Sequence, residues 1–137
     1  MGVIQARKDN QTIAEADIII SAGRGIGKKE NLNLIYKLAD IFSKSAVGGS
    51  RPLCDLGWLD YQQQIGITGM SVSPNLYFAL CISCAIQHLS GIRGARFIVA
   101  VNTDPNAAIF NMADICIVED LTTFIPALIE AFKETVN

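Results

Sequence analysis

The chain has 137 residues, with 11 Lys and Arg, 13 Asp and Glu and one His, so its formal net charge is −2. Half of the residues are hydrophobic, which excludes an intrinsically disordered chain because this composition buries enough apolar surface to offset the entropy of ordering. The length predicts one domain with a real core. A mildly acidic balance without a basic run excludes an electrostatic nucleic-acid binder, so we expect no nucleic acid among the partners.

The composition also argues against insertion into a membrane. Within a stretch that has no charged residue, the apolar part Leu76–Leu89 has 14 residues, whereas a spanning helix needs about 20. The opening residues lack the apolar core of a signal peptide. Four cysteines stand in apolar contexts, which predicts buried, reduced thiols and a cytoplasmic protein.

The first predicted elements are a strand and a helix. The opening residues are polar and lack periodicity, so we expect a lead-in at 1–16 and one domain at 17–137. Asp17–Ser21 is a continuous apolar, β-branched run, typical of a strand that is buried on both faces. Apolar residues at helical spacing then predict a helix from about Leu34 to Phe42.

The later elements continue this alternation. Pro74 after Ser73 predicts a helix start, because serine caps helices and proline lacks only an N–H that the first turn leaves unpaired. Arg96–Val101 and Ile115–Val118 predict two more buried strands, and Phe124–Val136 predicts the last helix. Buried strands that alternate with helices predict an α/β fold with a doubly wound, mostly parallel sheet.

Two glycine clusters lie at ends of predicted elements. In Gly23–Gly27 the glycines let the backbone approach a phosphate, and Arg24 can pair with it bidentately. The third glycine comes one place too early for the dinucleotide fingerprint, and an ordinary tight turn is the alternative. In Val47–Pro52, Ser50 and Arg51 follow a strand end, where ligands bind in doubly wound sheets. The alternative there is a solvated arginine after a flexible turn.

A possible metal site needs to be weighed at one predicted helix. Cys81, Cys84 and His88 would share one face of that helix. A structural zinc needs a fourth ligand, and a second pair at metal spacing is missing. We therefore expect buried thiols, a structural histidine and no metal.

Polar side chains in three loops are candidates for contacts with a ligand. Thr68 stands between two glycines, and Asn102 with Asp104 follows a buried strand, as Asp120 follows another. Amides and carboxylates at strand ends can bind a ribose or an adenine. Helix capping is the alternative for the two aspartates.

In order and spacing, these segments resemble the C-terminal FAD-binding domain of the electron transfer flavoprotein α subunit. The resemblance extends from about Asp17 to Phe132, and the run Ala85–Leu89 is its most specific part. The segments that carry the resemblance are Ser21–Gly25, Val47–Arg51, Ile65–Gly69, Ile82–His88, Val101–Pro105, Ala113-Asp114 and Asp120-Leu121.

The resemblance implies a Rossmann-like sheet with helices on both faces, in which residues 17–137 form a domain that holds an extended FAD. The implied function is electron transfer from flavin dehydrogenases to a downstream acceptor, with a β subunit of the flavoprotein as partner. It would be a carrier rather than an enzyme with its own substrate, since no base–nucleophile pair surrounds the one histidine.

The resemblance also implies roles for individual residues. Thr68 would lie near the flavin N5, His88 near its O2 carbonyl and Arg51 against the isoalloxazine. A cation and a donor there favour the anionic reduced flavin and so raise the potential of the first electron step. The other implied cofactor-binding residues are Arg24, Ser50, Ser83 and Gln87 around the pyrophosphate and ribityl, Asn102, Asp120 and Leu121 at the adenosine, and Ile65, Gly66, Ile67, Cys84, Ala85 and Ile86 in the same loops.

The sequence departs from the family pattern at two positions. Ile67 replaces a glutamine, and Cys84 replaces a glycine where close backbone approach is expected. If these changes have eroded the flavin end, the alternative function is an adenine-nucleotide-binding regulatory or structural module without redox activity. A third alternative is a part of an acyl-CoA reductase or electron-bifurcating complex. The family's α subunit has a further N-terminal domain, so we expect either an excised domain or a natural short relative.

Overall fold

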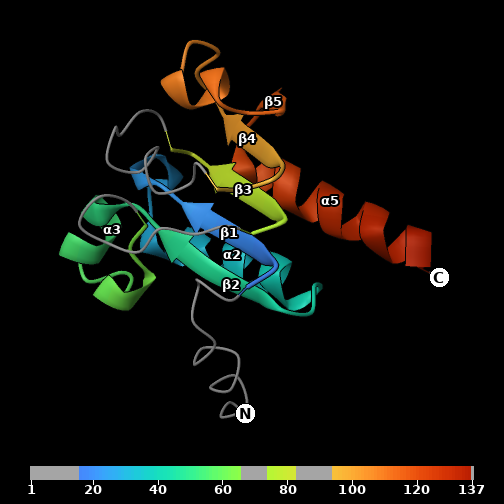
Figure 1. The fold of residues 1–137 in the computed structure, drawn as a ribbon, viewed down its shortest axis with the longest axis horizontal. Coiled ribbons are helices and arrows are strands. Elements are labelled where there is room, and N and C mark those ends of the chain that lie inside the picture. Colours follow the sequence, from blue (N-terminus) through green and yellow to red (C-terminus); the bar gives the residue numbers. More distant parts are fainter. Residues whose placement is uncertain (1–15, 66–73, 83–93, 137) are drawn as a thin grey trace.

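The computed structural model describes residues 16–65, 74–82 and 94–136. In this part of the chain, five strands form one parallel sheet in the order β2-β1-β3-β4-β5 (Figure 1). The strands are β1 (Ile18–Ala22), β2 (Ser45–Gly49), β3 (Leu76–Leu80), β4 (Ile98–Asn102) and β5 (Ile115–Val118). The helices are α2 (Leu32–Asp40), α3 (Arg51–Asp55) and α5 (Leu121–Val136), with short 3-10 turns η2 (Arg24–Ile26), η3 (Lys29–Asn31), η4 (Tyr61–Gln63) and η5 (Ala108–Asn111).

The strand order confirms the predicted doubly wound α/β fold. From β1 the chain moves outward to β2, then returns to place β3 on the other side of β1 and continues to β5. The direction of winding therefore reverses between β1 and β3. In such sheets the carboxyl ends of the strands on either side of the reversal leave room for a ligand.

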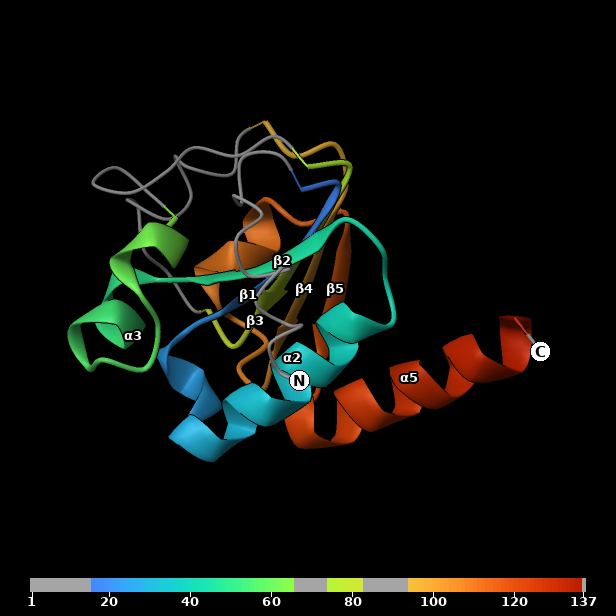
Figure 2. The same cartoon turned by 90° about the horizontal axis from the view of Figure 1, so that it is seen from below.

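Two hydrophobic layers hold the sheet. On one face, α2 and α5 lie side by side and pack on the strands, as Figure 2 shows. Phe42, just after α2, stacks on Phe78 of β3 with ring centroids 6.2 Å apart, and it meets Phe132 of α5 edge-on at 5.6 Å. On the other face, Ile65 and the η5 residue Ile109 pack against strand residues with small side chains. The small strand residues on that face are Ala46, Ala79 and Ala100.

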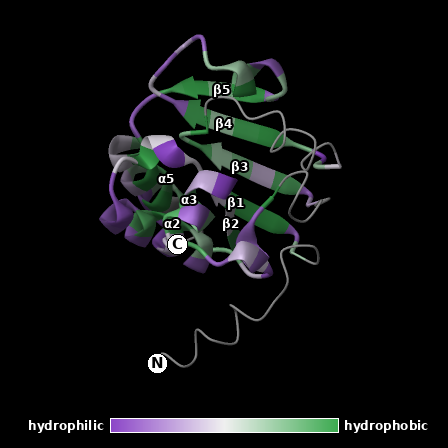
Figure 3. Cartoon of the chain, turned by 90° about the vertical axis from the view of Figure 1, so that its left-hand side faces the viewer, coloured by the Kyte–Doolittle hydropathy of each residue, from purple (hydrophilic) through white to green (hydrophobic). Residues whose placement is uncertain are grey.

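The edge strand β5 is less buried than its sequence predicts. Its hydrophobic run is typical of a strand buried on both faces, and Figure 3 shows hydrophobic residues throughout the strands. In the structure Ile115 and Val118 are exposed, with Val118 at 54%. The strand lies at the end of the sheet next to β4, so it lacks the cover that central strands receive. The prediction of a buried strand is therefore wrong for β5.

The predicted helix start at Ser73-Pro74 is also wrong, because the residues that follow form β3 in the middle of the sheet. A continuous apolar run fits a buried strand as well as a buried helix, and its tertiary pairing decides between them. Pro74 instead precedes the strand, where its carbonyl accepts a hydrogen bond from the Arg96 N–H at 3.0 Å. The strand β2 did not appear among the predicted strands.

The turn after β3 corrects the expectation for the cysteines. Cys81 does not lie on a helix: it follows β3 with φ of +61°, a left-handed conformation that ends the strand, and Cys84 lies outside the described residues. Cys54 and Cys81 are buried free thiols as expected, whereas Cys116 on β5 is exposed. Among the described residues, no group of three potential metal ligands comes together.

The turns after β1 and β3 approach each other closely. Gly23 donates its N–H to the Leu80 carbonyl at 3.0 Å, and Gly25 donates to the Cys81 carbonyl at 3.2 Å. A Cβ added to Gly23 would lie 2.6 Å from the Cys81 carbonyl oxygen and 2.7 Å from the Ile82 Cα. Both neighbours are backbone atoms, so they have little freedom to move aside.

No helix in residues 16–65, 74–82 and 94–136 is both long enough and apolar enough to cross a membrane.

We predict that Gly23→Ala lowers the free energy of unfolding by about 3 kcal/mol, because the added methyl overlaps backbone atoms of the neighbouring turn. Gly27→Ala is the control. Gly27 has φ of +84° and open space around it, so this variant loses only the free energy of backbone strain, about 1–3 kcal/mol, with no steric overlap. Urea unfolding of the two variants and the parent measures both effects. A Gly23→Ala protein as stable as the parent would contradict the close approach.

We predict that Cys116 reacts with a thiol reagent at pH 8 much faster than the two buried cysteines. Burial, with smaller effects from nearby carboxylates, raises the pKa of Cys54 and of Cys81 to about 11. Their reactive thiolate forms are therefore populated at about one part in a thousand at pH 8. In a Cys84→Ser background, one equivalent should react rapidly, and Cys116→Ser should remove it. Three rapid equivalents in that background would show that the core is open to solvent.

Candidate functional site

The carboxyl ends of the strands bring several segments of the resemblance into one row. Backbone hydrogen bonds between adjacent strands continue at the carboxyl ends of the strands. They are Ser50 N–H to the Ala22 carbonyl (3.1 Å), Gly23 N–H to Leu80 (3.0 Å), Cys81 N–H to Val101 (2.8 Å) and Glu119 N–H to Asn102 (3.1 Å). Segments far apart in the sequence thus follow one another along a single edge of the sheet, in the order of the strands.

At the β2 end of this row, Ser50 and Ile65 are brought together by a loop that returns to its origin. The chain leaves β2 through α3, turns, and comes back so that the Ile65 N–H donates to the Gly49 carbonyl at 3.0 Å, beside a parallel bridge between Gly49 and Gln64. Gly48 makes room for this return, since a Cβ there would lie 2.6 Å from the Ile65 Cδ1. Ser50 is buried at the start of α3 and does not use its side chain to cap that helix.

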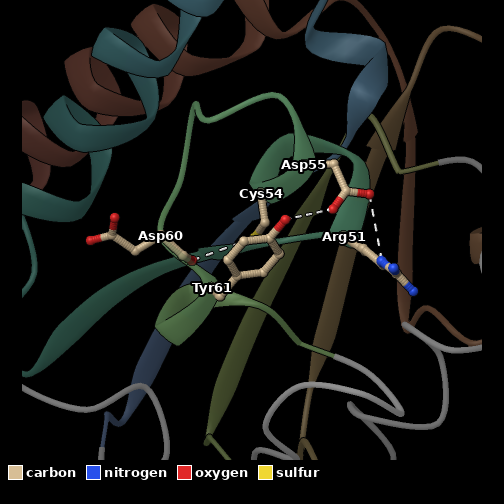
Figure 4. Close-up of polar contacts among 5 residues, drawn as sticks. All are labelled: Arg51, Cys54, Asp55, Asp60 and Tyr61. Carbon is tan, nitrogen blue, oxygen red and sulfur yellow. Dashed lines mark hydrogen bonds and ion pairs between the residues drawn. The ribbon is translucent and has the colours of Figure 1, made fainter.

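Arg51 opens α3 at the same end and is 64% exposed. Figure 4 shows its guanidinium beside Asp55, with 3.5 Å between Arg51 Nε and Asp55 Oδ2. The other oxygen of Asp55 accepts a hydrogen bond of 2.8 Å from the Tyr61 hydroxyl. This bond is the main cause that raises the pKa of Tyr61 above its ordinary value. The predicted flavin-side cation is therefore part of a group of three polar side chains.

In the middle of the row, Arg24 lies on η2 directly after β1 and is exposed. The adjacent Gly25 is fixed on the Cys81 carbonyl, which places this turn at the reversal between β1 and β3. Arg24 and the glycine backbone thus occupy the position where a doubly wound sheet binds phosphate. The contact of Arg24 with a pyrophosphate stays a prediction.

A hollow with a volume of about 240 Å³ extends from the turn after β1, in the middle of the row, to the start of α5 at its far end. A pocket for a whole drug-sized ligand holds about 300–1,000 Å³, so this hollow fits one end of an extended dinucleotide. Of the predicted residues, Asp120 and Leu121 line it. The complete lining is Gly25, Ile26, Lys28, Asn31, Cys81, Thr103, Asp120, Leu121 and Thr122.

Asn102 and the aspartates at this end make bonds within the protein. Asn102 is buried, its Nδ2 donates to the Ile82 carbonyl at 3.3 Å, and its Oδ1 accepts from the Asp104 N–H at 2.9 Å. Asp120 caps α5, because its Oδ1 accepts from the Thr122 N–H at 2.8 Å and from the Thr122 hydroxyl at 2.7 Å. The capping alternative is thus correct for Asp120, and these bonds lower the pKa of its carboxyl.

Asp104 likewise holds a turn, with its Oδ1 accepting from the Asn106 N–H at 2.9 Å. The predicted contact of Asn102 with adenosine stays a prediction, and so do the contacts of Asp120 and Leu121. The Asn102 side chain links the end of β4 to the segment after β3, and it thereby fixes the backbone of both segments at this end of the row.

Many predicted residues lie outside the described residues, so nothing here places them. They are Gly66, Ile67, Thr68, Ser83, Cys84, Ala85, Ile86, Gln87 and His88. The described residues on either side place the start of each segment. Ile65 precedes the first at the β2 end, and Ile82 precedes the second beside Gly23 and Asn102.

The sequence did not predict six polar residues of the site. Lys28, Asn31, Thr103 and Thr122 line the hollow, and Asp55 and Tyr61 contact each other near Arg51. Asp55 stands four residues after Arg51, a spacing that brings opposite charges together on a helix, so the sequence contained that signal. Thr103 directly follows a predicted residue. No sequence pattern indicated Tyr61, because its contact with Asp55 forms only when the loop after α3 returns to β2.

Comparison with known families identifies residues 12–93, more than half of the chain, as an electron transfer flavoprotein FAD-binding domain. An electron transfer flavoprotein subunit alpha of Syntrophomonas wolfei is 47% identical over 122 residues, which cover 89% of this chain and 38% of that protein. The protein FixB of Azotobacter vinelandii is 46% identical, covering 92% of this chain and 35% of that protein.

A third relative, the acryloyl-CoA reductase electron transfer subunit beta of Anaerotignum propionicum, is 45% identical, covering 98% of this chain and 38% of that protein. The chain thus spans less than half of the length of the curated relatives it matches. The strand-end segments, the family match and these identities agree, and the chain belongs to the electron transfer flavoprotein FAD-binding domain family, with FAD as its cofactor.

Proposed function

We propose that this chain holds FAD in an extended conformation along the carboxyl edge of its sheet and serves as the electron-carrying domain of an electron transfer flavoprotein. The flavin end would lie at β2, the pyrophosphate at the reversal between β1 and β3, and the adenosine beside β4 and the start of α5.

The order of the predicted residues along the edge is the observation that carries this proposal. Arg51 follows β2, Arg24 follows β1 and Leu121 follows β5. The sheet places these strands in the order β2, β1, then β3 to β5, which differs from their order in the chain. That spatial order matches the covalent order of flavin, pyrophosphate and adenosine in FAD, although the sequence order does not.

The shape of the edge supports a dinucleotide rather than a single nucleotide. Neighbouring strands are about 4.8 Å apart, so four intervals between β2 and β5 make an edge of about 19 Å. The glycines after β1 keep side chains out of the middle of this edge. Arg24 and Lys28 supply positive charge near it, which suits a pyrophosphate. The part of the hollow beside Thr103 and Leu121 would take the smaller, adenosine part.

When bound, FAD supplies the electron transfer chemistry itself. The chain's part is to bind and orient it: Arg51 presents a positive charge at the flavin end, and the turns after β1 and β3 provide a fixed backbone surface. We propose cofactor contacts for residues 66–68 and 83–88 on the strength of the resemblance, with Thr68 and His88 at the flavin.

The proposed partners are a β subunit of the flavoprotein and flavin dehydrogenases, with a cytoplasmic location that the free cysteines support. We propose a domain at 17–137 after a lead-in at 1–16. Since one relative bears the name of an acryloyl-CoA reductase electron transfer subunit, a role beside a reductase is one form of the same electron-carrying function.

The visible absorption spectrum of the purified chain, before and after incubation with FAD and desalting, tests the proposal. We predict that the chain retains FAD, because the described edge offers contacts at three separate parts of the cofactor. ADP should compete only weakly, since it lacks the flavin-end contacts at Ser50 and Arg51. A chain that retains no flavin and binds ADP as tightly as FAD would contradict the proposal and favour the nucleotide-binding module.

A further inference from the structure

The contact between Tyr61 and Asp55 joins two turns that are separate in the sequence. Tyr61 lies on η4, is 62% exposed, and donates its hydroxyl to Asp55 Oδ1 at 2.8 Å. The same carboxylate presents Oδ2 to Arg51 Nε at 3.5 Å. Asp55 is therefore shared between a neutral donor and a cation, with one oxygen for each.

The backbone of η4 is fixed in a way that holds Tyr61 in reach. Asp60 and Gln63 form a capping box around the turn, in which the Gln63 Oε1 accepts from the Asp60 N–H at 3.0 Å. Gln63 also donates its Nε2 to the Val47 carbonyl of β2 at 3.0 Å. The Cys54 thiol donates to the Asp60 carbonyl at 3.4 Å, which ties η4 to α3. Tyr61 therefore lies on a turn that is hydrogen-bonded both to β2 and to α3.

The division of the carboxylate affects how Arg51 can pair. Arginine and a carboxylate prefer two parallel hydrogen bonds, which occupy both oxygens and one edge of the guanidinium. The hydrogen bond from Tyr61 to Oδ1 orients the Asp55 carboxylate so that Oδ2 faces the Nε side of Arg51. Figure 4 shows the terminal nitrogens of Arg51 pointing away from Asp55 and Tyr61.

We propose that Tyr61, acting through Asp55, is a positioning residue for the Arg51 guanidinium. By donating to Oδ1 it fixes the orientation of the Asp55 carboxylate with Oδ2 toward Arg51 Nε, and so it holds the terminal nitrogens of Arg51 turned away from α3 toward the flavin. This inference rests on the proposed function, which puts the flavin at the β2 end.

Substitutions of Tyr61 and of Asp55 should shift the reduction potential of the bound flavin in opposite directions. Tyr61→Phe removes the hydrogen bond that orients the Asp55 carboxylate, so the carboxylate can rotate into a two-bond pair with Arg51, which then presents less charge to the flavin. Asp55→Asn removes the negative charge beside Arg51, so the flavin experiences more positive charge. Positive charge favours the anionic reduced flavin. A purely structural role would weaken the loop in both variants without this opposition.

The test is the one-electron reduction potential of FAD bound to the full chain. Tyr61→Phe should lower the equilibrium constant for reduction by about two- to fivefold, and Asp55→Asn should raise it by a similar factor, as the usual strength of an exposed ion pair allows. Ser43→Ala and Asp17→Asn are the controls for loss of an exposed hydroxyl and an exposed carboxylate, and neither should shift the potential. Shifts of the same sign in Tyr61→Phe and Asp55→Asn, or none, would overturn the inference.

A second measurement on the chain without FAD checks the contact itself. Titration of the Tyr61 phenol by NMR should give a pKa above the ordinary value, because the hydrogen bond to Asp55 stabilises the neutral phenol. Asp55→Asn should lower this pKa toward the ordinary value, while Asp17→Asn should leave it unchanged. A Tyr61 pKa that does not respond to Asp55→Asn would refute the inference whatever the potentials show.

Arg51→Ala separates failure of this inference from failure of the proposed function. If Arg51→Ala lowers the potential and Tyr61→Phe does not, Arg51 faces the flavin but Tyr61 does not position it. If Arg51→Ala leaves the potential unchanged, the flavin does not lie at the β2 end. In that case the proposed placement of the cofactor is wrong, and the inference about Tyr61 falls with it.

Discussion

The site depends on the close approach of the two turns that follow β1 and β3. The chain winds in opposite directions from this point, so these turns border the only place where neighbouring connections can diverge and leave backbone exposed to a ligand. The left-handed turn at Cys81 directs its carbonyl toward Gly25 and close to Gly23. Any side chain at Gly23 would overlap backbone atoms, so the geometry of the edge requires glycine there.

Once these turns are fixed, the parallel ladder determines the rest of the edge. The hydrogen bonds that continue past β2, β4 and β5 place Ser50, Asn102 and Glu119 in sequence along it. The strand ends then contribute different groups: Arg51 and buried Ser50 at β2, Arg24 with exposed glycine backbone at β1, and a hollow that extends from the β1 turn to the start of α5. An extended dinucleotide needs such a series of dissimilar subsites, whereas the two hydrophobic layers beneath need only fill space.

The sequence predicted the fold class and the strands β1, β4 and β5 to within about two residues, because their apolar runs are long and β-branched. It missed β2, whose Ser-Ala-Val-Gly-Gly run is small and weakly apolar, and it assigned the start of β3 to a helix because a proline suits both. The strand-end residues Arg24, Ser50 and Arg51 were predictable from glycine clusters. Their order in space, and the contact between Tyr61 and Asp55, follow from strand pairing and loop closure, which local patterns do not encode.

The most direct test of the account compares the backbone amide NMR shifts that ADP and FAD cause in the same chain. If the cofactor lies along the edge in the order argued above, ADP shifts the amides of Gly25, Thr103 and Leu121 and leaves Arg51 and Ile65 unchanged. FAD shifts both groups. ADP shifts at Arg51, or FAD shifts confined to the far end, would contradict the extended placement of the cofactor from β2 to α5.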